Sequence, residues 1–419
     1  MANIYHRNIP IDLMETILDM LVHEVAFCEA TENQNSINRF WIRSHAFTRS
    51  TLQVVLAALC LVNTTCYKIS VGRLYTDVHL STPAELSIFR RTLTQSKRKG
   101  VLREYVKTLV FFNFCRHEHR HEAQQYALTK AQQDFTAVCN LCPNLLTSTI
   151  LRSDSEYKRS LFDILRRRDP PPRAHPLHSG QVACDHLTRL VLQSPASRSL
   201  AFADLPFPRL QELVLIDFIS LTYNRLDLPS SMPSLLTLRF IDCKFWGHHM
   251  PFPSHAPRLR ILEVVNGVIM TRRFWNAIET VANSLQSLIL VPETLAMSSR
   301  GFDFTTLSNV TEMRFRFGRS MSTTWLDPVF PASVERLAFE CTCSYDTQII
   351  AYIQRITISL LKSKANSVHL CLLESLSLYR PPQLDSSMDK SLLGAIANSA
   401  QVKLTFFDYP GKCKKMLVR

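Results

Sequence analysis

Apolar side chains recur at helical spacing in two stretches near the start of the chain. The first stretch places apolar residues at positions 13, 14, 17, 18 and 21, and Pro10 stands just ahead of them, where it favours the first turn of a helix. The second stretch repeats this spacing with Leu52, Val55, Leu56, Leu59 and Val62. A third helix is expected over residues 66–74, and the alternation of residues 75–80 predicts a strand. Helices this short cannot bury their apolar faces alone, so we expect them to pack together or to bind a partner.

Two parts of this region also carry a sequence motif, Ile9-Pro10-x-x-Leu13-x-x-x-Ile17-Leu18 and Leu59-Cys60-Leu61-Val62-Asn63. Together they resemble the F-box motif, with residues from about 24 to 50 inserted as a loop. Residues 72–80 are similar to the sequence that follows the motif in many fungal F-box proteins. The resemblance implies docking on the Skp adaptor of SCF ubiquitin ligases, and it assigns this contact to Ile9, Pro10, Leu13, Ile17, Leu18, Leu59 and Val62. From the residues alone, a helical cap for the following domain stays open as the alternative.

The next segment shows signals for two helices and a strand between them. Thr82, Pro83 and Glu85 form a helix start with a capping box, and this helix is expected to reach about Lys97. A strand is predicted over residues 105–112, and helical spacing returns over residues 128–141.

From residue 187 onward the pattern apolar-x-x-apolar-x-apolar recurs at nearly even intervals. Successive units begin 23, 25, 24, 26, 25 and 24 residues apart. They start at Leu187, Leu210, Leu235, Leu259, Leu285, Val310 and Val334. Earlier copies begin at Val106 and Leu145, and later copies begin at Leu373 and Val402. A unit of this size buries its apolar side chains only by stacking on its neighbours, so the periodicity predicts a solenoid.

This repeat resembles the leucine-rich repeat, in which each unit adds one short strand to a parallel inner sheet. Helices are expected in three connecting segments, residues 272–282, 347–361 and 386–400. The Asn or Cys that usually follows the last leucine of a unit by three residues appears only as Cys243. We therefore predict an α/β chain. A small helical F-box-like domain would cover residues 1–80, and a leucine-rich-repeat-like solenoid with a parallel inner sheet would cover residues 81–419.

The charge of the chain bears on its partners rather than on its fold. The formal net charge is +13, and basic residues crowd into residues 90–107, 166–168 and 412–419. Such clusters can bind nucleic acid electrostatically. No zinc-finger, helix-turn-helix or RNA-binding signature accompanies them, so we interpret them as solvated surface and do not expect nucleic acid as a partner.

The sequence predicts a protein of the cytoplasm or nucleus. The chain opens with polar residues rather than with a secretory leader, and its twelve cysteines show no framework spacing. The longest apolar run, residues 52–62, is far shorter than the roughly 20 residues that span a bilayer, so no membrane contact is expected.

No catalytic chemistry is predicted. Cys115, His117, His119 and His121 are potential zinc ligands, with a Cys pair at 139 and 142 downstream, but their charged neighbours indicate a solvated loop. We therefore predict no metal and no cofactor. Hydrolase and zinc-protease motifs are missing, and the chain has only nine glycines, which disfavours a phosphate-binding loop. We expect no enzyme activity.

These observations favour a substrate-recognition adaptor of an SCF-type ubiquitin ligase, assembled with the Skp adaptor and a cullin-based ligase. A protein substrate would lie on the inner sheet, against the outward strand positions Arg189, Glu212, Arg239, Glu263, Glu312, Arg314, Arg316 and Arg336. The excess of arginine suggests an acidic or phosphorylated ligand, because a guanidinium pairs bidentately with carboxylate and phosphate. A repeat scaffold without a ubiquitin-ligase role and a basic nucleic-acid-associated protein stay open as alternatives.

Overall fold

The structure is a computed structural model of the whole chain. It describes residues 16, 53–62, 64–113, 130–131, 133–135, 137–152, 186–193, 200–201, 207–216, 218–220, 226–228, 231–245, 252–253, 255–266, 268–269, 273–291, 294–295, 303–317, 329–341, 347–366, 372–380 and 390–408. The chain divides into two compact units, residues 1–168 (unit 1) and residues 169–419 (unit 2).

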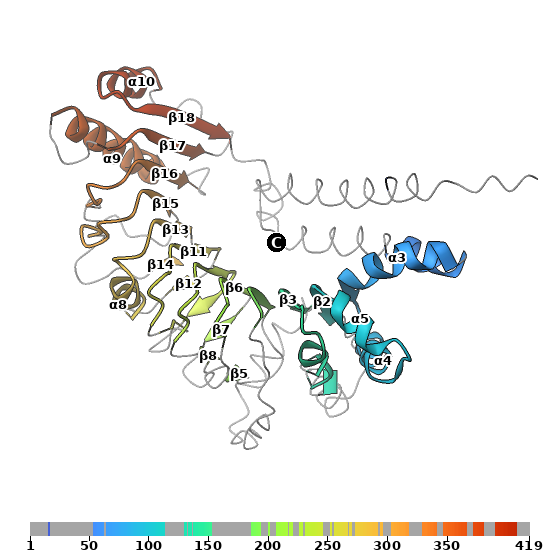
Figure 1. Ribbon diagram of the computed structural model, residues 1–419. Coiled ribbons are helices and arrows are strands. Elements are labelled where there is room, and N and C mark those ends of the chain that lie inside the picture. Colours follow the sequence, from blue (N-terminus) through green and yellow to red (C-terminus); the bar gives the residue numbers. More distant parts are fainter. Residues whose placement is uncertain are drawn as a thin grey trace, which may run out of the picture. The chain divides into compact units, whose positions relative to one another are not determined.

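Unit 1 combines short helices with three parallel strands among its described residues, ordered β1–β2–β3 (Figure 1). Residues 53–62 are helical, and so are residues 130–131, 133–135 and 137–141. The other elements are α3 (Thr64–Thr76), β1 (Asp77–Leu80), α4 (Pro83–Gln95), α5 (Lys99–Tyr105), β2 (Thr108–Asn113) and β3 (Thr147–Arg152). The predicted third helix, the strand that ends at residue 80 and the helix of residues 128–141 are thereby confirmed to within a few residues.

The start of α4 follows the prediction closely. The side-chain oxygen of Thr82 accepts the N–H of Glu85 at 3.1 Å, and the Glu85 carboxylate accepts the N–H of Ser81 at 2.6 Å. The capping box therefore closes one residue earlier than its usual form. The predicted start of a strand at residue 105 is wrong, because Tyr105 ends α5 and β2 begins at Thr108. Helix α5 was missed because its seven residues are too few to show a helical period.

Unit 2 is built on nine parallel strands of one sheet among its described residues, stacked in chain order (Figure 1). They are β4 (Arg189–Gln193), β6 (Glu212–Ile216), β9 (Thr237–Ile241), β11 (Ile261–Val265), β13 (Ser287–Val291), β15 (Glu312–Phe317), β16 (Arg336–Cys341), β17 (Ser375–Arg380) and β18 (Lys403–Asp408). Each strand coincides with one copy of the predicted repeat. The α/β class and the parallel sheet are therefore confirmed.

Shorter elements connect these strands. Four of them pair in parallel in the order β14–β12–β10–β7, and two more form the pair β5–β8. Their bounds are β5 (Leu200–Ala201), β7 (Ile219–Ser220), β8 (Leu226–Asp227), β10 (Lys244–Phe245), β12 (Val268–Ile269) and β14 (Thr294–Leu295). The three predicted helices are present as α8 (Arg273–Thr280), α9 (Thr347–Asn366) and α10 (Lys390–Ser399).

One hydrogen-bond pattern repeats at the start of each strand from β6 to β17. The N–H groups of two successive residues donate to a single carbonyl of the preceding repeat, as Leu236 and Thr237 do to Gln211 at 2.8 and 2.9 Å. The apolar residue that opens each unit, such as Leu235 or Leu259, is fully buried behind this contact. Backbone pairing and apolar burial therefore fix the same register in each of these repeats.

The chain leaves two of the strands through a left-handed residue. Asp242 and Asn266 have φ angles of 54° and 53°, which Asp and Asn tolerate better than most residues. Cys243 follows, buried, and its thiol donates to the carbonyl of Leu215 in the preceding unit at 3.2 Å. This cysteine therefore bonds the backbone of the neighbouring repeat.

The end of the predicted F-box-like domain is part of a sheet. β1 pairs in parallel with β2, from Asp77 opposite Thr108 to Leu80 opposite Phe111. Residues 77–80 therefore share a sheet with β2 and β3, and the compact unit that contains them extends to residue 168.

Candidate functional site

Helix 53–62 exposes aliphatic side chains that a folded helix would normally bury. The exposed fractions are 88% for Leu61, 68% for Val54, 65% for Val62 and 41% for Val55. Leu56 is buried on the opposite face, and the Gln53 side chain donates to the carbonyl of Asp77 at 2.8 Å, which holds the helix against β1. Exposed aliphatic residues on an anchored helix are typical of a protein-docking surface.

This helix contains the described part of the predicted Skp contact. Val62 is exposed, whereas Leu59 is half-buried. Ile9, Pro10, Leu13, Ile17 and Leu18 lie outside the described residues. Val55 and Val62, which helical spacing predicted on a buried face, are exposed instead, and only Leu56 of that face is fully buried among the described residues. Val54 and Leu61 were not predicted as exposed residues, because the spacing selects the buried face.

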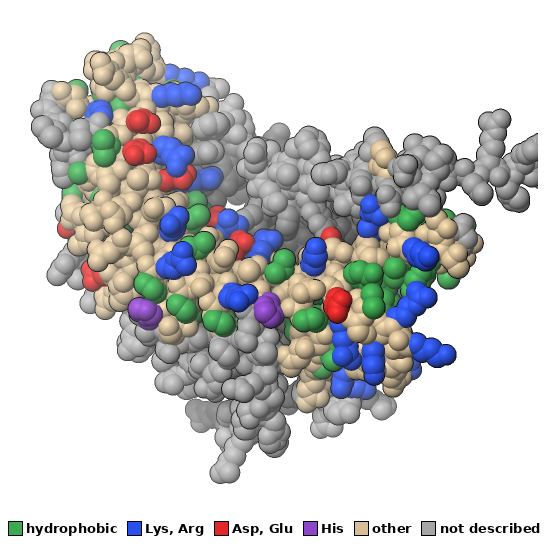
Figure 2. Space-filling model, in the orientation of Figure 1, with side chains coloured by type: hydrophobic (Ala, Val, Ile, Leu, Met, Phe, Trp, Pro, Cys, Tyr) green, Lys and Arg blue, Asp and Glu red, His purple; other side chains and the backbone are tan. Residues whose placement is uncertain are grey.

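The predicted substrate residues on β4 to β11 form a chain of ion pairs across neighbouring strands. Arg189 contacts Glu212 at 2.8 Å, Glu212 contacts Arg239 at 3.4 Å, and Arg239 contacts Glu263 at 3.0 Å. The register explains two of these contacts, because Arg189 lies opposite Glu212 and Arg239 lies opposite Glu263. Basic and acidic side chains are accordingly interspersed over the strands of unit 2 in Figure 2.

The remaining predicted residues lie on the next strands. Arg336 on β16 contacts Glu312 on β15 at 3.3 Å, and the two residues are paired in register. Arg314 lies two residues after Glu312, where its charge acts on Glu263. Arg316 belongs to β15, but its side chain lies outside the described set. The described members of this set therefore share one face of the sheet, with four arginines against three glutamates.

Glu263 is the most shielded carboxylate of this chain of ion pairs, with 15% of its side chain exposed. Burial raises the pKa of Glu263 above its ordinary value of 4.5, and the charges of Arg239 and Arg314 oppose that rise. The two arginines therefore oppose the effect of burial on this carboxylate.

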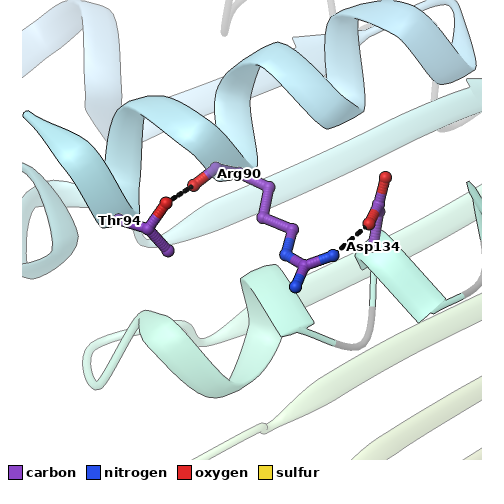
Figure 3. Close-up of polar contacts among 3 residues, drawn as sticks. All are labelled: Arg90, Thr94 and Asp134. Carbon is purple, nitrogen blue, oxygen red and sulfur yellow. Dashed lines mark hydrogen bonds and ion pairs between the residues drawn. The ribbon is translucent and has the colours of Figure 1, made fainter.

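A further ion pair fastens α4 to the helical residues near 130–141. Asp134 is buried with 4% of its side chain exposed, and the Arg90 guanidinium points at it from α4 (Figure 3). The Thr94 hydroxyl donates to the carbonyl of Arg90 one turn earlier on the same helix. This arrangement is structural, because Asp134 is too enclosed to meet a ligand.

The described residues hold no cluster of three His, Cys, Asp or Glu side chains with the arrangement of a metal site. Residues 115–121 lie outside the described set. Of the downstream pair, Cys142 is buried, and burial raises the pKa of its thiol to about 12. This thiol therefore keeps its proton at neutral pH.

Within the described part of the chain, no helix has the length and apolar character needed to cross a bilayer. No protein-family model matches the sequence, and no curated protein matches it at a significant level.

Proposed function

We propose that this protein is the substrate-recognition subunit of an SCF-type ubiquitin ligase and acts in the cytoplasm or nucleus. Its F-box-like segment binds the Skp adaptor, and its repeat unit holds a protein substrate. Ubiquitin transfer is left to other subunits, so the chain itself is no enzyme. The observation that carries the proposal is the exposed aliphatic surface of helix 53–62, whose residues Leu61 and Val62 belong to the second part of the F-box-like motif.

Unit 2 supports the proposal that the protein holds a substrate. Parallel strands present one row of charged residues after another, and ion pairs of 2.8 to 3.4 Å hold six of them in place: Arg189, Glu212, Arg239, Glu263, Glu312 and Arg336. Because these residues are held in position, a ligand that pairs with them loses little conformational entropy in the protein. A guanidinium has five N–H donors, so an arginine that pairs with a neighbouring carboxylate still has donors for a ligand.

The distribution of charge over the strands indicates where on the sheet an acidic or phosphorylated ligand would bind. Arg189, Glu212, Arg239 and Glu263 carry two charges of each sign, which leaves no net attraction for an anion. On β15 and β16, the described side chains of this face include two arginines, Arg314 and Arg336, against Glu312. We therefore place the anionic part of the substrate at β15 and β16.

The proposal is tested by co-expressing the chain with the Skp adaptor and capturing the adaptor. A variant with Leu61→Ser and Val62→Ser removes exposed aliphatic surface without opening the core. Each aliphatic side chain buried on binding contributes about 1.5–3 kcal/mol, so captured protein should fall more than tenfold. The matched control is Ile88→Ser, which changes another exposed aliphatic residue on α4.

Absence of capture of the folded wild-type protein would contradict the proposal and favour a repeat scaffold. Binding to nucleic acid that weakens steeply with salt would instead favour the nucleic-acid alternative. Equal capture of the wild type and the Leu61, Val62 variant would show that helix 53–62 is not the docking surface.

A further inference from the structure

Basic side chains lie near the start of α3, the helix that follows helix 53–62 in the chain. The guanidinium carbon of Arg98 lies 4.8 Å from the centre of the Tyr67 ring, and Tyr67 follows Val62 by five residues in the first turn of α3. This cation–π contact holds the turn between α4 and α5 against the start of α3. The exposed Lys68, Lys97 and Lys99 are sequence neighbours of Tyr67 and Arg98, and we call Lys68, Lys97, Arg98 and Lys99 the basic rim.

Figure 2 shows hydrophobic and basic side chains close to each other in unit 1. Hydrophobic side chains gather over α3 and α5, and Lys and Arg side chains lie along their borders. Val101 adds to the apolar part, because it is half exposed on α5 just after Lys99. Apolar centre and charged border are the usual arrangement of a protein interface.

The acidic residues described in unit 1 do little to neutralise the basic rim. The described side chains of unit 1 include ten Lys or Arg residues and four Asp or Glu residues. Asp134 is buried against Arg90, and Glu85 bonds the backbone at the far end of α4. Glu104 lies at the opposite end of α5 from Lys99, and Asp77 lies in β1. The surface around Arg98 therefore carries a positive potential.

The exposed aliphatic residues distinguish a protein partner from a nucleic acid. A phosphate backbone would pair with the basic rim but would leave Leu61 and Val62 in water, and those two side chains are 88% and 65% exposed. A protein with an apolar groove and acidic residues around it would bury the aliphatic side chains and pair with the lysines at the same time.

We infer that helix 53–62 and the basic rim form one composite docking surface for an acidic protein, in which the basic rim steers the partner and the aliphatic side chains retain it. The inference rests on the proposed function, since the Skp adaptor is the partner to be tested. It assigns the adaptor an acidic border around its apolar contact. Long-range attraction raises association rates and is screened by salt, whereas the buried apolar contact controls dissociation.

The test measures association and dissociation rates of the full chain with the purified Skp adaptor at about 50 mM and about 500 mM salt. A variant with Lys97→Glu and Lys99→Glu reverses two exposed charges of the basic rim. The control, Arg258→Glu with Lys403→Glu, makes the same change in net charge at exposed positions of unit 2. Wild type and control should lose about tenfold in association rate between the two salt concentrations.

The rim variant should associate about tenfold more slowly than wild type at low salt, with little further change on adding salt and with its dissociation rate altered less than about threefold. Leu61→Ser with Val62→Ser should instead raise the dissociation rate. If the rim variant associates as fast as wild type while the adaptor still binds, the inference is wrong and the proposed function stands. If the adaptor does not bind the folded wild-type protein at all, both are wrong. Binding of a random RNA of about 20 nucleotides that the rim variant loses, with unchanged adaptor kinetics, would assign the basic rim to nucleic acid instead.

Discussion

Arg239 on β9 lies directly opposite Glu263 on β11 and contacts its carboxylate at 3.0 Å, although the two residues are 24 positions apart in the chain. The same guanidinium reaches Glu212 on β6 at 3.4 Å. One arginine therefore joins the carboxylates of two flanking repeats. Residues that the sequence analysis treated as separate ligand contacts form a single network of ion pairs.

Removing Arg239 should raise the pKa of Glu263 further. Among the charges that lower this pKa, Arg239 contributes most and Arg314 less, while burial and the charge of Glu212 act in the opposite direction. In Arg239→Ala the carboxyl group should therefore titrate at a higher pH than in wild type. Arg239→Lys keeps the charge and should restore most of the difference. Carbon-detected NMR titration of the carboxyl group measures both, and an unchanged pKa in Arg239→Ala would contradict the ion pair.

Glu263 should also make the stability of unit 2 depend on pH. Because its pKa is raised, the folded protein binds this proton more tightly than the unfolded chain. The free energy of unfolding should therefore fall as pH rises from the ordinary value of 4.5 to the raised value, and it should be level above that. Glu263→Gln should remove this part of the slope. Urea unfolding of both proteins from about pH 4 to about pH 8 measures it, and parallel curves would contradict the prediction.

Arg90→Ala should destabilise unit 1, because Asp134 would stay buried without its cation. Unpaired buried polar groups cost about 1–3 kcal/mol, and the lower half of that range is expected because the Arg90 side chain is 47% exposed. Arg91→Ala, at an exposed neighbouring position, is the matched control and should change stability by less than about 0.5 kcal/mol. Adding Asp134→Asn to Arg90→Ala should recover part of the loss in urea unfolding. Equal stability of the two alanine variants would show that the ion pair contributes nothing.

Gln401→Gly should stabilise the end of α10. Gln401 has a φ of 54°, its N–H donates to Asn398, and the N–H of Val402 donates to Ala397. This is the Schellman ending of a helix, whose left-handed position usually holds glycine. Relief of the side-chain strain is worth about 1 kcal/mol. A thermal melt should show a higher midpoint for Gln401→Gly and a lower one for Gln401→Val. The reverse order would contradict the left-handed conformation.

The apolar periodicity of the sequence identified the repeats and the strand in each of them. Leu235, Leu238 and Phe240 are all fully buried, as their spacing predicts for one unit. This spacing predicts which residues are buried, because each side chain of a strand faces either the core or the open face of the sheet. Helix α5 escaped the same approach, because a short helix shows no period and depends on contacts with its neighbours for stability.

The sequence by itself therefore determined the α/β class, the parallel order of the strands and the rows in which outward residues would lie. Tertiary structure alone decided how those rows interact. Arg189, Glu212, Arg239 and Glu263 look like independent ligand contacts along the chain, but parallel register brings each charge within a few ångströms of its opposite. Likewise, attachment to β1 turned one face of helix 53–62 inward and left Leu61 and Val62 exposed. The physical reason is that apolar periodicity depends on residues close together in the sequence. Charge pairing and exposure depend instead on which distant residues the fold brings together.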